Sequence, residues 1–273
     1  MRTQCLGNRA AAEDAPPDPA AYSGEIRAAE LNGPGNRAAP PGSVIYAIGD
    51  IHGESSKLDL MHSMIRADAR GRVADRKVVV YLGDYVDRGP DSAGVIERLV
   101  GDPLPGFETV FLKGNHEEFM LHFLETGDSA SGWFHNGGLD TLEGYGVEVR
   151  GHSLWRPDSG ELRDALEEKL PDSHRRFLEA LDLYHIEGDY LFVHAGIRPG
   201  RALEEQTAAD MLWIRNKFLE SNKDHGFMVV HGHTPRDFPE VRPNRIGIDT
   251  GAVYGGKLTA LALEGEKRDF MQA

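Results

Sequence analysis

The 273-residue sequence predicts an α/β fold in which helices cover layered sheets. Two patterns lead to this prediction. Short runs rich in Val, Ile and Leu alternate with helix-periodic segments after residue 43, and strands dominate the later part of the chain. The composition is that of a globular protein with a substantial core, because 40% of the residues are hydrophobic and 27% are charged.

The predicted elements follow a regular order. Strands and helices first alternate, as strand Val44–Ile48, helix Leu58–Ile65, strand Lys77–Leu82, helix Gly94–Val100, strand Phe107–Leu112 and helix His116–Glu125. A mainly helical stretch then covers about residues 128–182, with helices at Glu161–Leu170 and His174–Leu183. The remaining strands are Leu183–Ile186, Tyr190–His194, Phe227–His231, Arg245–Asp249 and Leu258–Leu263.

The beginning of the chain has a different composition. Residues 1–42 are rich in Ala, Pro and Gly and contain few large apolar side chains. Such a segment buries too little surface to offset its loss of conformational entropy, so we expect a flexible leader and a single domain over residues 43–273. The lone cysteine, Cys5, cannot form an internal disulfide. No hydrophobic stretch of a secretory signal follows Arg2, so a cytoplasmic location is expected.

The charge balance argues against several classes of partner. There are 30 Lys and Arg against 44 Asp and Glu, which gives a formal net charge of −14. Nucleic acids and anionic membranes attract proteins with excess positive charge, so we expect neither as a partner. A membrane-spanning helix is not expected either, because no apolar run approaches the roughly 18–20 residues that one requires.

Polar residues gather where five predicted strands end, each beside a glycine. The five segments are Gly49–Gly53, Gly83–Gly89, Gly114–Glu117, His194–Gly196 and His231–Thr234. The carboxyl ends of strands form the ligand crevice of open α/β sheets, so we expect these side chains to meet at one edge. Each segment alone would fit a helix N-cap, an ordinary turn or a hydrogen-bonded core histidine. Their combination favours a ligand site.

The residue types at this edge suit a pair of metal ions. Oxygen and imidazole ligands without a thiolate favour Mn²⁺, with Fe or Zn as alternatives, over a structural cysteine–zinc site. Asp50 and His52 are two positions apart on an extended segment, so they point the same way and can hold one ion. The other candidate ligands are Asp84, placed to bridge both ions, and Asn115, His194 and His233 for the second ion. Two ions about 3.5–4 Å apart can acidify a shared water into a nucleophile.

These five segments resemble the calcineurin-like metallophosphoesterase superfamily, and within it the bacterial and bacteriophage-lambda branch of the phosphoprotein phosphatase family. The resemblance spans most of residues 44–264. Weaker matches are Asn136–Gly138, Trp213–Arg215 and Asp249–Tyr254. The resemblance implies a four-layer α/β/β/α sandwich, with a helical cap inserted at roughly residues 118–182 and a dinuclear metal centre at one edge.

The resemblance also implies a role for individual residues. It assigns Asp50, His52 and Asp84 to the first metal, and Asp84, Asn115, His194 and His233 to the second. His233 matches the ligand because it precedes Thr-Pro, which leaves His231 as a second choice. His116 matches the general acid, oriented by Asp87. The positions that match phosphate-binding residues are Arg88, Arg215, Asn115 and Tyr254.

The implied reaction is direct hydrolysis, in which a metal-bridging hydroxide attacks phosphorus in line without a phosphoenzyme. A serine/threonine protein phosphatase is the first expectation, since Asp87 and Glu117 differ from what symmetrical dinucleoside tetraphosphatases usually carry. A dinucleoside polyphosphate hydrolase, or a broad small-molecule or tyrosine-phosphate phosphatase, is the alternative. A catalytically inactive scaffold is the third. Lys113 replaces the Arg of the eukaryotic enzymes, and no regulatory subunit is expected.

Overall fold

The computed structural model describes residues 37–128, 132–149 and 159–273. Its first sheet has the strand order β10-β9-β1-β2-β3. The strands are β1 (Ser43–Ile48), β2 (Arg76–Tyr81), β3 (Glu108–Phe111), β9 (Thr259–Glu264) and β10 (Lys267–Gln272). β1, β2 and β3 pair in parallel, whereas β9 and β10 are antiparallel. The carboxyl ends of the three parallel strands therefore share one edge.

The second sheet has the order β4-β5-β6-β8-β7. Its strands are β4 (Tyr184–Glu187), β5 (Tyr190–Val193), β6 (Met228–His231), β7 (Glu240–Val241) and β8 (Arg245–Gly247). The central β5, β6 and β8 are parallel, and the two outer strands are antiparallel to their neighbours. This sheet also directs three strand ends to a common edge.

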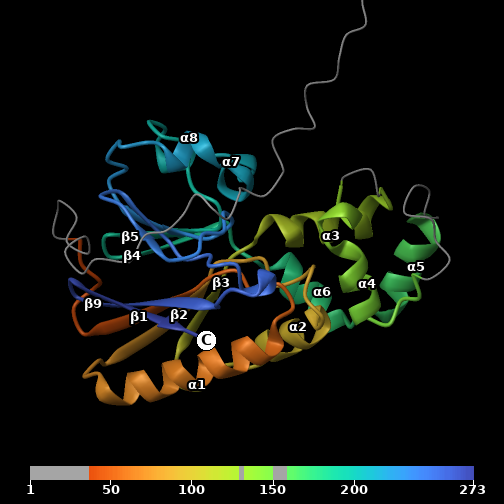
Figure 1. Cartoon of the computed structure of the whole chain (residues 1–273), viewed down its shortest axis with the longest axis horizontal. Coiled ribbons are helices and arrows are strands. Elements are labelled where there is room, and N and C mark those ends of the chain that lie inside the picture. The colour runs from red at the N-terminus through yellow and green to blue at the C-terminus, as the bar shows by residue number, and fades with distance from the viewer. Residues whose placement is uncertain (1–36, 129–131, 150–158) are drawn as a thin grey trace, which may run out of the picture.

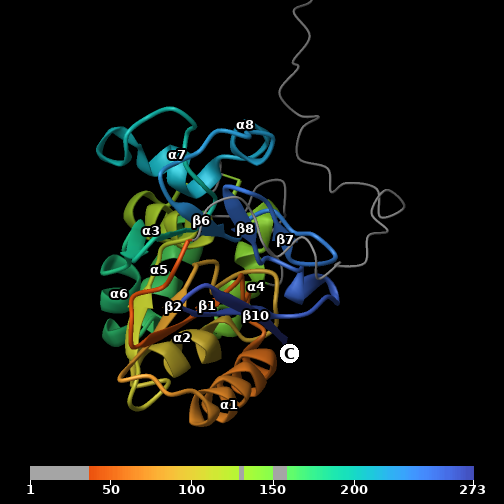
Figure 2. The ribbon, with the colours of Figure 1, turned by 90° about the vertical axis from the view of Figure 1, so that its left-hand side faces the viewer.

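Helices cover both outer faces of the paired sheets (Figures 1 and 2). On the first sheet lie α1 (Ser55–Gly71) and α2 (Ser92–Val100), and on the second lie α7 (Ala208–Trp213) and α8 (Asn216–Leu219). Between β3 and β4 the chain forms α3 (Asn115–Thr126), η4 (Phe134–Asn136), α4 (Gly138–Gly144), α5 (Ser159–Lys169) and α6 (Asp172–Glu179). The short 3₁₀ turns η5 (Leu203–Glu205) and η6 (Ala252–Tyr254) complete the described elements.

Side chains alternate between two cores along each central strand. In β1, Tyr46 packs into the cluster beneath the helices, whereas Ile45 and Ala47 pack between the sheets. In β5, Phe192 belongs to the cluster between the sheets, and Leu191 packs with α7 and α8. This period of two is what a strand buried on both faces requires. The predicted four-layer α/β/β/α arrangement is confirmed.

The strands β7 and β10 and the helix α7 were not predicted. β10 has the sequence KRDFMQ and pairs only with β9, so its polar side chains can face solvent at the sheet edge. The predicted helix His174–Leu183 is also shorter than expected and ends at Glu179. Edge strands and short helices carry weak hydrophobic periodicity, which explains why the sequence pattern missed them.

Residues 37–42, which the sequence pattern placed in the leader, contact the body of the protein; residues 1–36 lie outside the described part of the chain. The Ala39 side chain is buried, and its backbone N–H donates to the Gly265 carbonyl at 2.9 Å. The Ala38 N–H donates to the Asp189 carboxylate at 3.0 Å. These contacts tie residues 37–42 to the turn between β9 and β10 and to the turn between β4 and β5.

A pair of truncations tests this contact. We expect a protein lacking residues 2–42 to melt about 4–8 °C below one lacking residues 2–36, because at least two hydrogen bonds and some apolar burial are lost. Thermal denaturation followed by circular dichroism measures the difference. Equal melting temperatures would show that residues 37–42 do not stabilise the fold.

Among the described residues, no helix has both the length and the apolar character needed to cross a membrane.

Candidate metal centre

The polar residues predicted at the strand ends converge at one edge of the sandwich. Loops after β1 and β2, the start of α3, the end of β5 and the loop after β6 supply them. The buried members are Asp50, His52, Asp84, Asp87, Asn115, His116, His194 and His233. Burying so many polar groups is costly unless they serve one another or a ligand.

The backbone of this region is strained. Among the described residues, five non-glycine residues have positive φ: His52, Asp84, Asp87, Arg88 and His233. Each such residue costs on the order of 1–3 kcal/mol, and strain of this kind concentrates at functional sites. All five were candidate site residues on sequence grounds, so local strain and predicted chemistry coincide.

Two glycines allow carboxylates to lie against the backbone. A Cβ atom on Gly114 would lie 2.1 Å from Asp84 Oδ1, and one on Gly232 would lie 2.0 Å from Asp50 Oδ1. No larger residue fits either position without displacing the acid. The glycines beside the predicted ligands therefore serve close packing as well as tight turns.

One cluster of potential ligands is formed by Asp84, Asn115, His194 and His233. Asn115 Oδ1 lies 2.9 Å from both His194 Nε2 and His233 Nδ1. Asp84 Oδ2 lies 3.4 Å from His194 Nε2. Atoms bound at about 2.1 Å to one ion are roughly 3 Å apart, so this spacing fits a shared cation.

The protonation of these histidines supports a cation. His194 Nδ1–H donates to the Leu82 carbonyl at 2.9 Å, which leaves Nε2 as a bare lone pair facing Asn115 Oδ1. Two acceptors at 2.9 Å repel each other unless a positive charge lies between them. Burial lowers the pKa of His194 and of His233, so both imidazoles are neutral as ligation requires. The site residues therefore fit a divalent ion.

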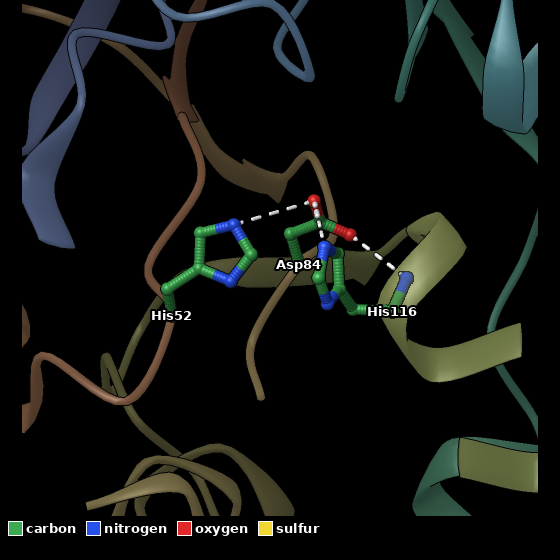
Figure 3. Close-up of side chains that lie close together, drawn as sticks. All are labelled: His52, Asp84 and His116. Carbon is green, nitrogen blue, oxygen red and sulfur yellow. Dashed lines mark hydrogen bonds and ion pairs between the residues drawn. The ribbon is translucent and has the colours of Figure 1, made fainter. Parts of the chain in front are cut away.

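A second cluster shares Asp84 with the first (Figure 3). Asp84 Oδ2 lies 3.5 Å from His52 Nε2 and 3.9 Å from His116 Nε2. His52 Nδ1–H donates to the Val86 carbonyl at 2.8 Å, and burial lowers the pKa of His52 to about 3. Burial would raise the pKa of Asp84, but the surrounding histidines outweigh it and hold that pKa below its usual value. Asp84 is thus a buried carboxylate common to both clusters, as its predicted bridging role requires.

Asp50, predicted in the first metal set, does not join this cluster of described residues. Its carboxylate accepts the backbone N–H of His233 at 2.9 Å. Burial, with the charges of Asp249 and Asp84, raises its pKa well above the usual range. A buried acid in that state needs a cation nearby to ionise, and a first metal between Asp50 and His52 would supply one.

His116 and Asp87 form a hydrogen-bonded pair beside the clusters. His116 Nδ1 lies 2.6 Å from Asp87 Oδ2, and both side chains are buried. Burial would lower the pKa of His116, but the charge of Asp84 and the bond to Asp87 together raise it. A histidine that retains a proton next to the ligand cluster can act as a general acid.

The predicted phosphate-binding residues surround this centre. Arg88 Nη1 donates to His52 Nε2 at 2.9 Å, and its guanidinium lies over the Tyr254 ring at 5.6 Å from the centroid. Arg215 is exposed between α7 and α8, and its charge helps to lower the pKa of His194 and of His233. Tyr254 is 63% exposed at the rim.

Residues 43–258 match the calcineurin-like phosphoesterases. The chain belongs to this family.

Curated relatives of this calcineurin-like phosphoesterase carry two kinds of name. An asymmetrical bis(5′-nucleosyl)-tetraphosphatase PrpE of Oceanobacillus iheyensis is 28% identical over 242 residues, which cover 79% of this chain and 87% of the relative. The serine/threonine-protein phosphatase 2 of Escherichia coli is 27% identical over 230 residues, which cover 79% and 90%.

A solved structure, provisionally assigned as a diadenosine tetraphosphatase, has the same fold with a TM-score of 0.56. It is 22% identical and covers 87% of this chain and 98% of its own.

His231, the second-choice ligand, is engaged away from the centre of this phosphoesterase. Its Nδ1–H donates to the Gly232 carbonyl at 3.0 Å, and its Nε2 lies 3.2 Å from Arg245 Nη1. Burial, followed by the charge of Arg245, lowers the pKa of His231 to about 3. The structure places His233 in a cluster of potential ligands, whereas His231 contacts Arg245 at the start of β8.

Glu117 has a positional role that the sequence did not reveal. Its carboxylate accepts the backbone N–H groups of Asp84 at 2.9 Å, Tyr85 at 2.7 Å and Gly114 at 2.8 Å. It therefore ties the loop that carries Asp84 to the start of α3. On the sequence alone, Glu117 pointed only to the class of substrate.

Three further residues near the centre were missed as site residues. Asp249 is buried close enough to Asp50 to raise its pKa, and it follows β8 as the other candidates follow their strands. Its place just after a strand could have identified Asp249 as a site residue. Trp133 and Thr141 contact Asp87 from the segment between α3 and α5, and no local motif marked them.

Proposed function

We propose that this metal-dependent phosphoesterase hydrolyses dinucleoside polyphosphates. The observation that carries the hydrolytic part is the arrangement of two ligand clusters that share Asp84 beside the His116–Asp87 pair. The names of the PrpE relatives support a nucleotide substrate. This choice reverses the order expected from the sequence, in which a protein phosphatase came first.

The residues of this chain would share the work as follows. When bound, two divalent ions would neutralise phosphate charge and lower the pKa of water at the site. Asp50, His52 and Asp84 would hold one ion, and Asp84, Asn115, His194 and His233 the other. Arg88 and Arg215 would donate to the non-bridging phosphate oxygens, where planar guanidinium groups suit bidentate contact. His116 would give its proton to the leaving oxygen while Asp87 stabilises the imidazolium.

Two exposed aromatic rings support a nucleoside at the rim. Trp213 is 37% exposed and packs edge-on against Phe119 with centroids 4.8 Å apart, and its ring centroid lies 6.3 Å from that of His233. Tyr254 lies on the Arg88 side of the centre. Lys57 holds the turn before Tyr254 through the Ala252 carbonyl at 2.5 Å. A nucleobase stacked on such a ring gains about 1–3 kcal/mol.

A protein phosphatase is the second candidate, and the His116–Asp87 pair favours it. A serine or threonine alkoxide is a poor leaving group that needs a proton, whereas a nucleotide phosphate leaves readily without one. The Escherichia coli relative carries a protein phosphatase name. Substrate competition is therefore the deciding experiment.

We expect diadenosine tetraphosphate to show a kcat/KM at least tenfold above those of phosphoserine, phosphothreonine and phosphotyrosine peptides, a margin of about 1.4 kcal/mol. An asymmetrical split would give a mono- and a triphosphate, which chromatography separates from two diphosphates.

Replacing Tyr254 by alanine should raise KM for the dinucleotide about tenfold if the ring stacks on a base. Tyr254→Phe, which keeps the ring, is the matched control and should behave as the wild type. A higher kcat/KM for a phosphopeptide would make the second candidate the function.

A further inference from the structure

The Asp87 carboxylate receives more hydrogen bonds than its partner His116 accounts for. Thr141 Oγ1–H donates to Oδ1 at 2.6 Å, and Trp133 Nε1–H donates to Oδ2 at 2.9 Å. The His116 bond, at 2.6 Å, also ends on Oδ2. Both added donors come from the segment between α3 and α5, far from β2 in sequence.

These donors fix the proton in the pair. Tryptophan can only donate, so the Asp87 oxygen that it meets must accept. That same oxygen faces His116 Nδ1, so the ring proton lies on Nδ1 and Nε2 is the atom turned toward Asp84. Since Thr141 holds Oδ1 and Trp133 holds Oδ2, the carboxylate cannot rotate without breaking a bond.

The surrounding backbone is shaped to keep Trp133 in place. Its side chain is fully buried and its ring lies 4.9 Å, centroid to centroid, from that of Phe123. A Cβ atom on Gly138 would lie 2.5 Å from the Trp133 indole, and one on Gly137 would lie 2.5 Å from the backbone nitrogen of Arg88. Gly137 also has a φ of 99°, which glycine adopts without strain. The Asn136–Gly138 motif thus brings the start of α4 against both Asp87 and Arg88.

We propose that Trp133 and Thr141 are positioning residues for proton donation by His116, so that the inserted helices take part in catalysis and not only in substrate choice. The proposal rests on the proposed phosphoester hydrolysis. It requires that neither residue touches substrate or metal. Their whole effect must pass through Asp87 and His116.

The test uses substrates whose leaving groups differ in how much they need a proton. Trp133→Phe removes the indole donor and leaves a smaller aromatic ring. Thr141→Val keeps the shape of the side chain and removes the hydroxyl, which donates to Asp87 Oδ1 and also accepts the Asp87 backbone N–H at 2.9 Å. For each variant, loaded with Mn²⁺, kcat is measured with 2,4-dinitrophenyl phosphate, phenyl phosphate and a phosphoserine peptide. We expect kcat to fall about tenfold for the peptide and less than threefold for the dinitrophenyl ester, with KM and metal content unchanged. Thr126→Val, an exposed threonine at the end of α3, is the matched control and should change nothing.

Two further measurements separate positioning from general disruption. In a His116→Asn background, Thr141→Val should cause no additional loss with the peptide, because the path through His116 is already broken. Thr141→Ser should restore the wild-type rate. An equal loss with all three esters, or an additive loss in the His116→Asn background, would overturn the proposal.

A spectroscopic readout keeps the proposal independent of the proposed activity. In ¹⁵N-histidine-labelled protein, the Nδ1–H of His116 should give a downfield proton resonance that is absent in His116→Asn. We expect Trp133→Phe and Thr141→Val to shift or broaden it, and Thr126→Val to leave it unchanged. An unmoved resonance in both variants would contradict the proposal even if the wild type hydrolysed no phosphoester, whereas that inactivity would contradict only the proposed function.

Discussion

Replacing Asp84 by asparagine should lower turnover by about 10³-fold or more and reduce the bound metal from two ions per chain. Asp84 Oδ2 lies within 3.9 Å of His52, His116 and His194, so it is common to both clusters. Asparagine keeps the shape but removes the charge that two bound cations would share, and such charge stabilisation is worth several kcal/mol in the transition state.

Metal content and activity are measured together in this test. Wild-type protein treated with a chelator should lose activity with p-nitrophenyl phosphate and recover it on addition of Mn²⁺, whereas Asp84→Asn should not recover. Asp59→Asn, which removes an exposed carboxylate paired with Arg98, controls for loss of charge alone. A full metal complement in Asp84→Asn, or full activity in metal-free wild type, would contradict the bridging role.

The second large effect is expected from His116→Asn, which should lower kcat by about 10²–10⁴-fold with an alkyl ester and leave metal content unchanged. The loss should be smaller with p-nitrophenyl phosphate, because that leaving group needs less help from an acid. The metal content should not change because His116 Nδ1 is bonded to Asp87 and is therefore not available to bind a metal ion.

Comparing His116→Asn with Asp50→Asn tests whether His116 is the general acid or a metal ligand. His116 Nε2 lies in the same cluster as His52 and Asp84, whereas Asp50 lies outside it. If His116 is the acid and Asp50 the ligand, Asp50→Asn should lose metal and His116→Asn should keep it. The opposite result would make His116 a ligand of the first metal and would leave the general acid to another group.

The strand-end residues could be predicted because each is fixed by local chemistry. A strand that ends in a glycine and a polar side chain delivers that side chain to the sheet edge whatever the rest of the fold does. Asp84, His194 and His233 came together for this reason. The order of strands and helices along the chain was sufficient to predict layered sheets, whereas the four-layer sandwich was implied by the family resemblance.

The supporting residues could not be predicted, because their roles depend on how distant segments pack. Trp133 and Thr141 reach Asp87 across 46 and 54 positions of sequence. The sequence marked Asn136–Gly138 between them without a role, since a glycine's steric neighbour is visible only in the fold. Glu117 was noticed for its type, but its bonds to the Asp84 loop depend on where α3 begins.

The left-handed backbone of His52, Asp84, Asp87, Arg88 and His233 limits how this protein can change. At about 1–3 kcal/mol each, their combined strain is comparable with the 5–15 kcal/mol by which most domains are stable. Glycine at any of the five would relax the chain, yet it would delete a side chain of the centre. Selection for thermal stability and selection for catalysis therefore act in opposite directions at these positions, and stabilising substitutions should accumulate elsewhere in the sandwich.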